Sequence, residues 1–207
     1  QGIPTSVLVG KSGVIEWIGH PMELDEPLEA VVTDSWDREA FKKELEIRKQ
    51  FEENMQKVQM LAGAGRFKEA LAVVEAQSSA SRGTPTEAQW TGVGNQLKLK
   101  AGMLDDDVVA FFRDQLGQMK GDPYAVGRFA IMMYGEGEQG NDVGPLAADA
   151  LEAAKAELDD ASPDLKPLLY NAISLLHMQS GELDAAVEAQ QAAVDNAPDE
   201  RIKERLQ

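Results

Sequence analysis

Residues 170–198 read YNAISLLHMQSGELDAAVEAQQAAVDNAP, two apolar stretches of helical period that meet at Gly181. Apolar residues recur every three or four positions on both sides of this glycine, which predicts helices at about 163–179 and 183–195. Glycine between two helical stretches and a proline after the second, Pro198, are the residues that end helices. The segment therefore predicts a helix–turn–helix pair.

Most of the chain before this segment follows the same pattern. From about residue 36 onward the apolar side chains keep a helical period, and glycines or an Asp-Pro pair separate the stretches. Further helices are predicted around Ile47–Leu61, Phe67–Val74, Trp90–Ala101, Val109–Met119 and Val126–Met133, at 145–159, and in a last turn or two near Arg201–Leu206. The glycine-rich segment Gly135–Asn141 is predicted to be a loop. No convincing strand is predicted after residue 35, so this part is expected to be all-α.

The N-terminal part carries a different pattern. The runs Ser6–Val9 and Val14–Ile18 flank a turn with two glycines, which predicts a β-hairpin. The first run lacks polar alternation, which is typical of a strand covered on both faces. Residues 25–32, with Pro27 near their start, predict a short helix.

Composition excludes several kinds of site. The chain has 207 residues, with 36 acidic and 20 basic side chains and a formal net charge of −16, so nucleic acid and anionic membranes are poor partners. Cysteine is absent, which excludes disulfides, thiolate nucleophiles and cysteine-ligated metals. The two histidines, His20 and His177, lie far apart in the sequence, and both are assigned structural roles. No apolar stretch approaches 18 residues, so membrane insertion is not expected.

The segment Tyr170–Pro198 resembles a tetratricopeptide repeat. The matching residues are the aromatic Tyr170, the pair Ile173-Ser174, the turn residue Gly181, the small residues Ala186 and Ala193, and Pro198. His177 and Gln190 depart from the pattern, at positions that are usually aromatic and apolar. Other helix pairs match more weakly. The resemblance implies a tetratricopeptide-like helix-pair solenoid over residues 36–207.

The string Gly2-Ile3-Pro4-Thr5, followed by the hairpin and the short helix, resembles the last third of a thioredoxin fold. The match is to the redoxin branch of the thiol–disulfide oxidoreductases and covers about residues 2–33. It implies that residues 1–35 are the C-terminal remnant of a thioredoxin-like domain. It also implies that Ile3, Pro4 and Thr5 form a cis-proline loop, in which the backbone of Ile3 hydrogen-bonds a substrate peptide.

The same family uses a Cys-x-x-Cys pair at the start of a helix, where the thiolate is stabilised. Such a pair would have to precede Gln1, and the chain, which begins without Met or a signal peptide, is interpreted as a fragment of a longer protein. By itself it should be inactive in thiol exchange.

If the helical array binds a protein, the first helix of each pair is expected to line its concave face. In the best-matching repeat that face presents Asn171, Leu175, Met178 and Gln179. The negative net charge favours a basic or neutral partner.

No cofactor or metal site is predicted. The run Asp105-Asp106-Asp107 is interpreted as a helix N-terminus rather than a calcium loop, because the glycine and glutamate of an EF-hand are missing. The glycines between Gly135 and Gly144 lack the residues of a phosphate loop. Met119, Met132 and Met133 are interpreted as core residues rather than as an adaptable binding surface.

These patterns and resemblances together predict the C-terminal fragment of a thiol–disulfide oxidoreductase, with a helical-repeat region for protein–protein interaction. A non-enzymatic interaction scaffold and a dimerisation module are the alternatives. The isolated hairpin is expected either to pack on the first long helix or to pair with its copy in a homodimer. The compartment stays open between bacterial periplasm and cytoplasm.

Overall fold

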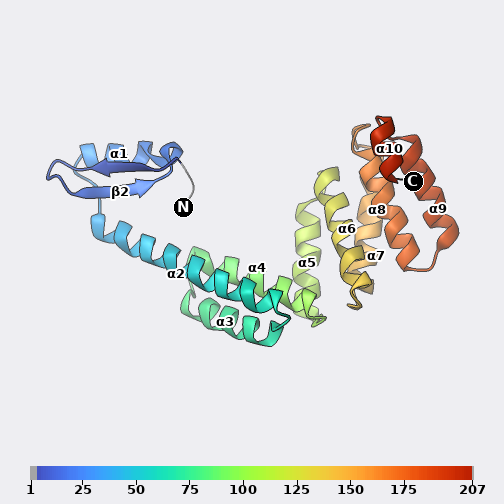
Figure 1. Cartoon of the computed structure of the whole chain (residues 1–207), viewed down its shortest axis with the longest axis horizontal. Coiled ribbons are helices and arrows are strands. Elements are labelled where there is room, and N and C mark those ends of the chain that lie inside the picture. The colour runs from blue at the N-terminus through green and yellow to red at the C-terminus, as the bar shows by residue number, and fades with distance from the viewer. Residues whose placement is uncertain (1–3, 207) are drawn as a thin grey trace. The chain divides into compact units, whose positions relative to one another are not determined.

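The computed structural model describes residues 4–206 as a mainly helical chain that begins with a small antiparallel hairpin (Figure 1). The chain divides into two compact units, one that ends at Met60 and one that begins at Leu61. The division falls inside the long helix α2, Arg38–Gly63, whose start lies a few residues after the boundary predicted at residue 35.

The first unit holds the hairpin, two short helices and most of α2. Strand β1, Ser6–Val9, pairs with β2, Ile15–Gly19, as predicted, and the 3-10 turn η1, Pro21–Glu23, and helix α1, Asp25–Val32, follow.

The pairing register decides which side chains of the hairpin share a face. Leu8 lies opposite Trp17 and Val7 opposite Ile18, with an irregularity between Leu8 and Val9. Trp17 is buried, whereas Val7 and Val9 are about half exposed, at 52% and 54%. The expectation that the first strand is covered on both faces is therefore wrong for this chain.

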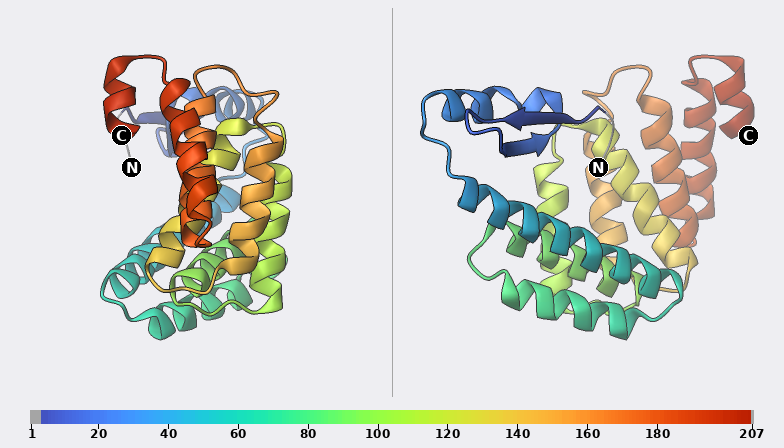
Figure 2. Two further views of the ribbon diagram at one scale, coloured as in Figure 1. Left: turned by 90° about the vertical axis from the view of Figure 1, so that its right-hand side faces the viewer. Right: turned by 60° about the vertical axis from the view of Figure 1, so that its left-hand side comes forward.

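The second unit consists of helices joined by short turns. Their bounds are α3 Phe67–Ala80, α4 Pro85–Lys100, α5 Asp106–Gln118, α6 Pro123–Glu138, α7 Gly144–Ala156, α8 Lys166–Gln179, α9 Leu183–Asp195 and α10 Glu200–Leu206. Helices α5 to α9 run alongside one another (Figure 1 and Figure 2). Helix α6 contacts both α7 and α8, and α8 makes its most extensive contact with α9.

Glycines with positive φ end most of these helices. Gly181, with a φ of 78°, follows α8, and there the N–H of Glu182 donates to the carbonyl of His177 while the N–H of Gly181 donates to Met178. This is the Schellman arrangement, which satisfies carbonyl groups at a helix end and needs a left-handed residue. This need for a left-handed residue explains why glycine follows most of these helices.

One predicted loop is wrong. Helix α6 continues through Gly135 and ends at Glu138, inside the segment Gly135–Asn141. Glu136 is buried, and its carboxylate accepts hydrogen bonds from the Lys100 ammonium at 3.2 Å and from the Asn141 amide at 3.0 Å. These two bonds hold the last turn of the helix despite its poor helix formers.

The core of the second unit lies among α5, α6, α7 and α8. Its most deeply buried large side chains are Val108, Val126, Met133, Leu146, Leu169 and Leu176. Alanines without exposed surface, such as Ala130 and Ala172, lie among them and allow the helix axes to approach closely. Met133 belongs to this core as expected, but Met132 is 39% exposed and does not.

Candidate functional site

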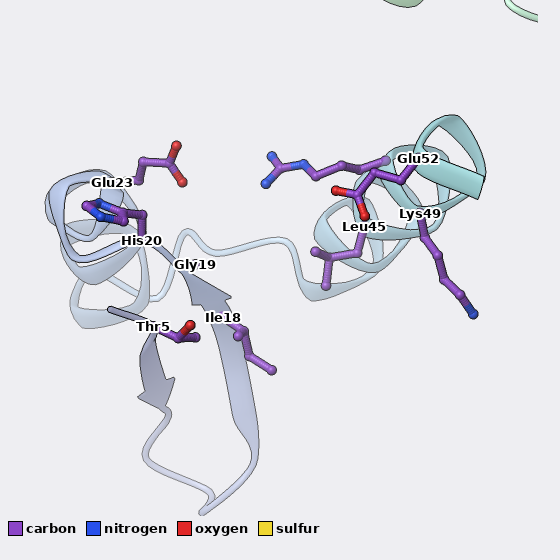
Figure 3. A pocket seen from close by; sticks show the side chains of 9 residues that line it. Thr5, Ile18, Gly19, His20, Glu23, Leu45, Lys49 and Glu52 are labelled. Atoms are coloured by element: carbon purple, nitrogen blue, oxygen red, sulfur yellow. The ribbon is translucent and has the colours of Figure 1, made fainter. Parts of the chain in front are cut away.

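Two regions of the structure are candidates for binding, and the first is a pocket within the first unit. It has a volume of about 430 Å³ and lies between the open end of the hairpin and α2 (Figure 3). Its N-terminal side is made by Thr5, Ile18, Gly19, His20 and Glu23. Thr5 is one of the three residues that the thioredoxin resemblance assigned to substrate binding. Pro4 is exposed and directly precedes it, and Ile3 lies outside the described residues.

Helix α2 supplies the opposite wall of this pocket through Leu45, Arg48, Lys49 and Glu52. These positions are spaced i, i+3, i+4 and i+7, so they share one face of the helix. This wall is not predicted from the sequence, because the apolar period of this stretch follows another row of the helix, which starts at Ile47. The sequence does contain a signal, one leucine and three charged residues at this helical spacing. No sequence pattern shows which other element such a helix face contacts.

The polar groups around the pocket differ in how they are partnered. Arg48 pairs with Glu44 at 3.0 Å, and Lys49 approaches Glu53 at 3.9 Å, both along α2. His20 caps η1, because its Nδ1 accepts a hydrogen bond from the N–H of Met22 at 3.3 Å. In the neutral imidazole, the proton is then on Nε2. His20 therefore has the structural role that the sequence predicted.

The hairpin is attached to the beginning of α2 by an ion pair. Glu16 on β2 is buried, and its carboxylate accepts hydrogen bonds from Nε of Arg38 at 2.7 Å and from Nη2 of the same side chain. The indole N–H of Trp36 donates to the carbonyl of Glu16 at 3.2 Å, and the Trp36 ring contacts Phe41. The hairpin thus contacts the long helix, one of the two outcomes expected for it.

The Glu16–Arg38 pair makes the hairpin sensitive to pH. The hydrogen bond from Arg38 lowers the pKa of the Glu16 carboxyl below its ordinary value. A carboxyl group with a lowered pKa contributes stability above its unfolded pKa of about 4.3, and this contribution is lost as the pH falls through the folded pKa.

We expect Glu16→Gln to weaken the protection of the β2 amides against hydrogen exchange at pH 7. At a pH below this lowered pKa, where the wild-type carboxyl is protonated, the two proteins should differ much less. Glu39→Gln serves as the control, because Glu39 is exposed and pairs with Lys42 on the helix surface. An equal loss of protection from Glu16→Gln at both pH values would contradict the assigned charge interaction.

The second candidate region is the exposed side of α6 and α8. The two helices run in the same direction, because Gly127 on α6 lies against Leu168 and Leu169 while Gly137 further along lies against Gln179. The side-chain amide of Gln179 donates to the backbone carbonyl of Tyr134 at 3.1 Å. Gln179, predicted as a partner-binding residue, therefore contributes to the contact between the two helices.

The other three predicted residues of α8 form a row at one side of this contact. Asn171 and Leu175 are half-buried, and Met178 is 45% exposed. A second row on α6, which was not predicted, consists of Tyr124, Arg128 and Met132. Since α6 and α8 run in the same direction, helical periodicity places both rows on the side away from the core.

The buried polar groups of the α8–α9 pair serve packing. The hydroxyl of Ser174 donates to the carbonyl of Ala186 at 2.8 Å, which links the two helices where the small residues meet. His177 is buried, and its Nδ1 lies in hydrogen-bond contact with the carboxylate of Glu182. Both contacts lie within one helix pair, as expected for residues with structural roles.

The described residues form neither a three-residue metal site nor a membrane-spanning helix. Across residues 4–206 no group of three His, Asp or Glu side chains is arranged to hold a metal ion. The side chain of Asp105 caps α5 by accepting from the N–H of Val108 at 2.9 Å. In the same part of the chain no helix combines the length and the apolar character that a membrane span requires.

Comparison with protein-family models, with curated proteins and with solved structures gives no match.

Proposed function

We propose that the chain is the C-terminal part of a thioredoxin-like thiol–disulfide oxidoreductase, whose tetratricopeptide-like helices bind a protein partner. Thiol exchange would belong to the parent protein, because the chain itself has no cysteine. The helices of this chain would bind the partner.

The thioredoxin part of the proposal is supported by the order of elements after Gly2-Ile3-Pro4-Thr5. An antiparallel hairpin, β1 and β2, is followed by the short helix α1, which is the order that the resemblance implies. The exposed valines of β1 also support it, since this strand has the apolar composition of one that is covered in a complete domain.

The partner-binding part rests on one observation, the exposed rows that α6 and α8 present side by side. Tyr124 at 55% exposed, Met132 at 39% and Met178 at 45% leave aromatic and thioether surface in contact with solvent. Tyrosine and methionine are enriched in protein interfaces, and methionine adapts to the shape of a partner. Stacked first helices of successive pairs are also the face by which helical repeats bind.

The variant Met178→Asp tests this proposal. The full chain is used to isolate its partner from the source cells, and the affinity of the purified partner is then measured by calorimetry. A charge at the centre of an apolar interface is expected to weaken binding about tenfold or more. Helix content should stay unchanged, because Met178 is exposed and outside the core.

The control is Val187→Asp on α9, where the replaced side chain is 70% exposed. This variant should bind the partner as the wild type does. If Val187→Asp weakens binding as much as Met178→Asp, the face formed by α6 and α8 is not the interface.

Dimerisation through the hairpin is a second candidate function. Val7, Val9 and Ile15 are each about half exposed, and in the described chain β1 pairs only with β2, which leaves the outer edge of each strand without a neighbouring strand. Open strand edges pair readily with another chain. Light scattering at micromolar protein concentration distinguishes a monomer from a dimer, and Val9→Lys would disrupt only a dimer that uses this face.

A further inference from the structure

The methionine side chains differ widely in exposure, although two of them are neighbours in the sequence. Met132 on α6 is 39% exposed and Met178 on α8 is 45% exposed, whereas Met133, the residue after Met132, has no exposed surface. Successive side chains of a helix point in directions about 100° apart, so Met132 reaches solvent while Met133 lies in the core. A reagent in solution can therefore reach one thioether of this Met-Met pair and not the other.

These thioethers are the reactive sulfur groups of the chain. The chain has eight methionines and no cysteine, so no thiol within it competes for an oxidant. When hydrogen peroxide oxidises methionine to the sulfoxide, the sulfur lone pair attacks one peroxide oxygen and a sulfur–oxygen bond forms. The oxygen–oxygen bond breaks, and the second oxygen leaves as water. The sulfur loses two electrons and the peroxide gains them, so no further reactant is needed.

Oxidation would change the chemistry of the exposed side of α6 and α8. A thioether is apolar and adapts to the shape of a partner, whereas a sulfoxide is polar. A polar oxygen that is enclosed in an interface without a hydrogen-bond donor costs binding free energy. Met132 and Met178 belong to the two rows on this side, so their oxidation would act on a single surface.

We infer that Met132 and Met178 are oxidation sites through which peroxide controls the binding of the partner. This inference rests on the proposed function of the exposed side of α6 and α8 and adds its regulation. Sulfoxides at the two positions weaken the complex. Reduction by methionine sulfoxide reductases, which return the sulfoxide to the thioether, restores it.

Peptide mass spectrometry of the full chain after graded exposure to hydrogen peroxide tests the sites themselves. Fragment ions that separate Met132 from Met133 should show a sulfoxide at Met132 before any at Met133. Met178 should be oxidised over the same range of peroxide concentration as Met132, because their exposed fractions are similar. Equal oxidation of Met132 and Met133 in the folded chain would overturn the inference.

Calorimetry with the purified partner measures the effect on binding. The chain is oxidised alone and the peroxide is removed before the partner is added, so that only the chain is modified. The oxidised chain should bind about tenfold more weakly, and treatment with methionine sulfoxide reductases for both sulfoxide epimers should restore the affinity. In the double variant Met132→Leu and Met178→Leu, oxidation should not change the affinity that this variant had beforehand.

The control is the double variant Met22→Leu and Met60→Leu, which removes two thioethers on η1 and α2 that are 87% and 67% exposed. Its affinity should fall on oxidation as that of the wild type does. Protection by this variant, or wild-type binding that oxidation does not weaken, would overturn the inference. If Met178→Asp weakens binding and oxidation does not, only the regulation is wrong. If neither weakens binding, the proposed interface is wrong as well.

Discussion

Replacement of Leu169 by alanine is expected to lower the unfolding free energy of the second unit by about 3 kcal/mol. Leu169 on α8 has no exposed surface and belongs to the core among α5, α6, α7 and α8. Its Cδ2 atom also lies 3.5 Å from the position that a Cβ atom at Gly127 would occupy. The truncation removes buried apolar surface and leaves a cavity that neighbouring helices can fill only in part.

Urea denaturation of the full chain, followed by circular dichroism at 222 nm, measures this loss. The control Leu183→Ala truncates the same residue type on α9, where the side chain is 64% exposed, and it should change stability by less than about 0.5 kcal/mol. Similar losses for the two variants would mean that α6 and α8 do not enclose Leu169 as described.

The second large effect is expected from Gly127→Val on α6. A Cβ atom at Gly127 would lie 3.0 Å from Cγ and 3.1 Å from Cδ2 of Leu168 on the neighbouring helix. Valine adds this Cβ atom and two methyl groups beyond it, so the helices must separate or the leucine must leave its rotamer. Overpacking of this kind costs about 2 kcal/mol, which should appear as a lower urea midpoint.

Gly135 on the same helix supplies the matched control. Nothing lies within 4 Å of a Cβ atom built at this position, so Gly135→Ala should gain about 0.5–1 kcal/mol through helix propensity alone. Gly127→Ala should gain less than Gly135→Ala, because its methyl group meets Leu168. Equal gains at the two glycines would contradict the close approach of α6 and α8.

The helices could be predicted well because their signals are local. The apolar period around Gly181 predicts α9 at the residues where the structure has it, and the Asp122-Pro123 pair marks the first turn of α6. The end of α6 could not be predicted. Glu136 is held by Lys100, which lies 36 residues earlier in the chain, and no pattern within Gly135–Asn141 records that partner.

The candidate sites were harder to predict for the same reason. Asn171, Leu175 and Met178 follow from the helical period of α8, but the role of Gln179 depends on Tyr134 of another helix. The pocket in the first unit requires that residues 45–52 of α2 face Thr5 and Ile18. That arrangement depends on the course of the chain between them, which the Glu16–Arg38 pair helps to fix.

The thioredoxin resemblance leads to the central claim, that these helices continue a thiol–disulfide oxidoreductase. The most direct test measures thiol-dependent reduction of a disulfide-bonded protein by the chain together with any extension that its gene encodes before Gln1. We predict a cysteine pair in that extension, reduction that is lost when the first cysteine is replaced by serine, and none by residues 1–207 alone. An extension without cysteine, or one whose cysteines can be replaced without loss of activity, would contradict the claim.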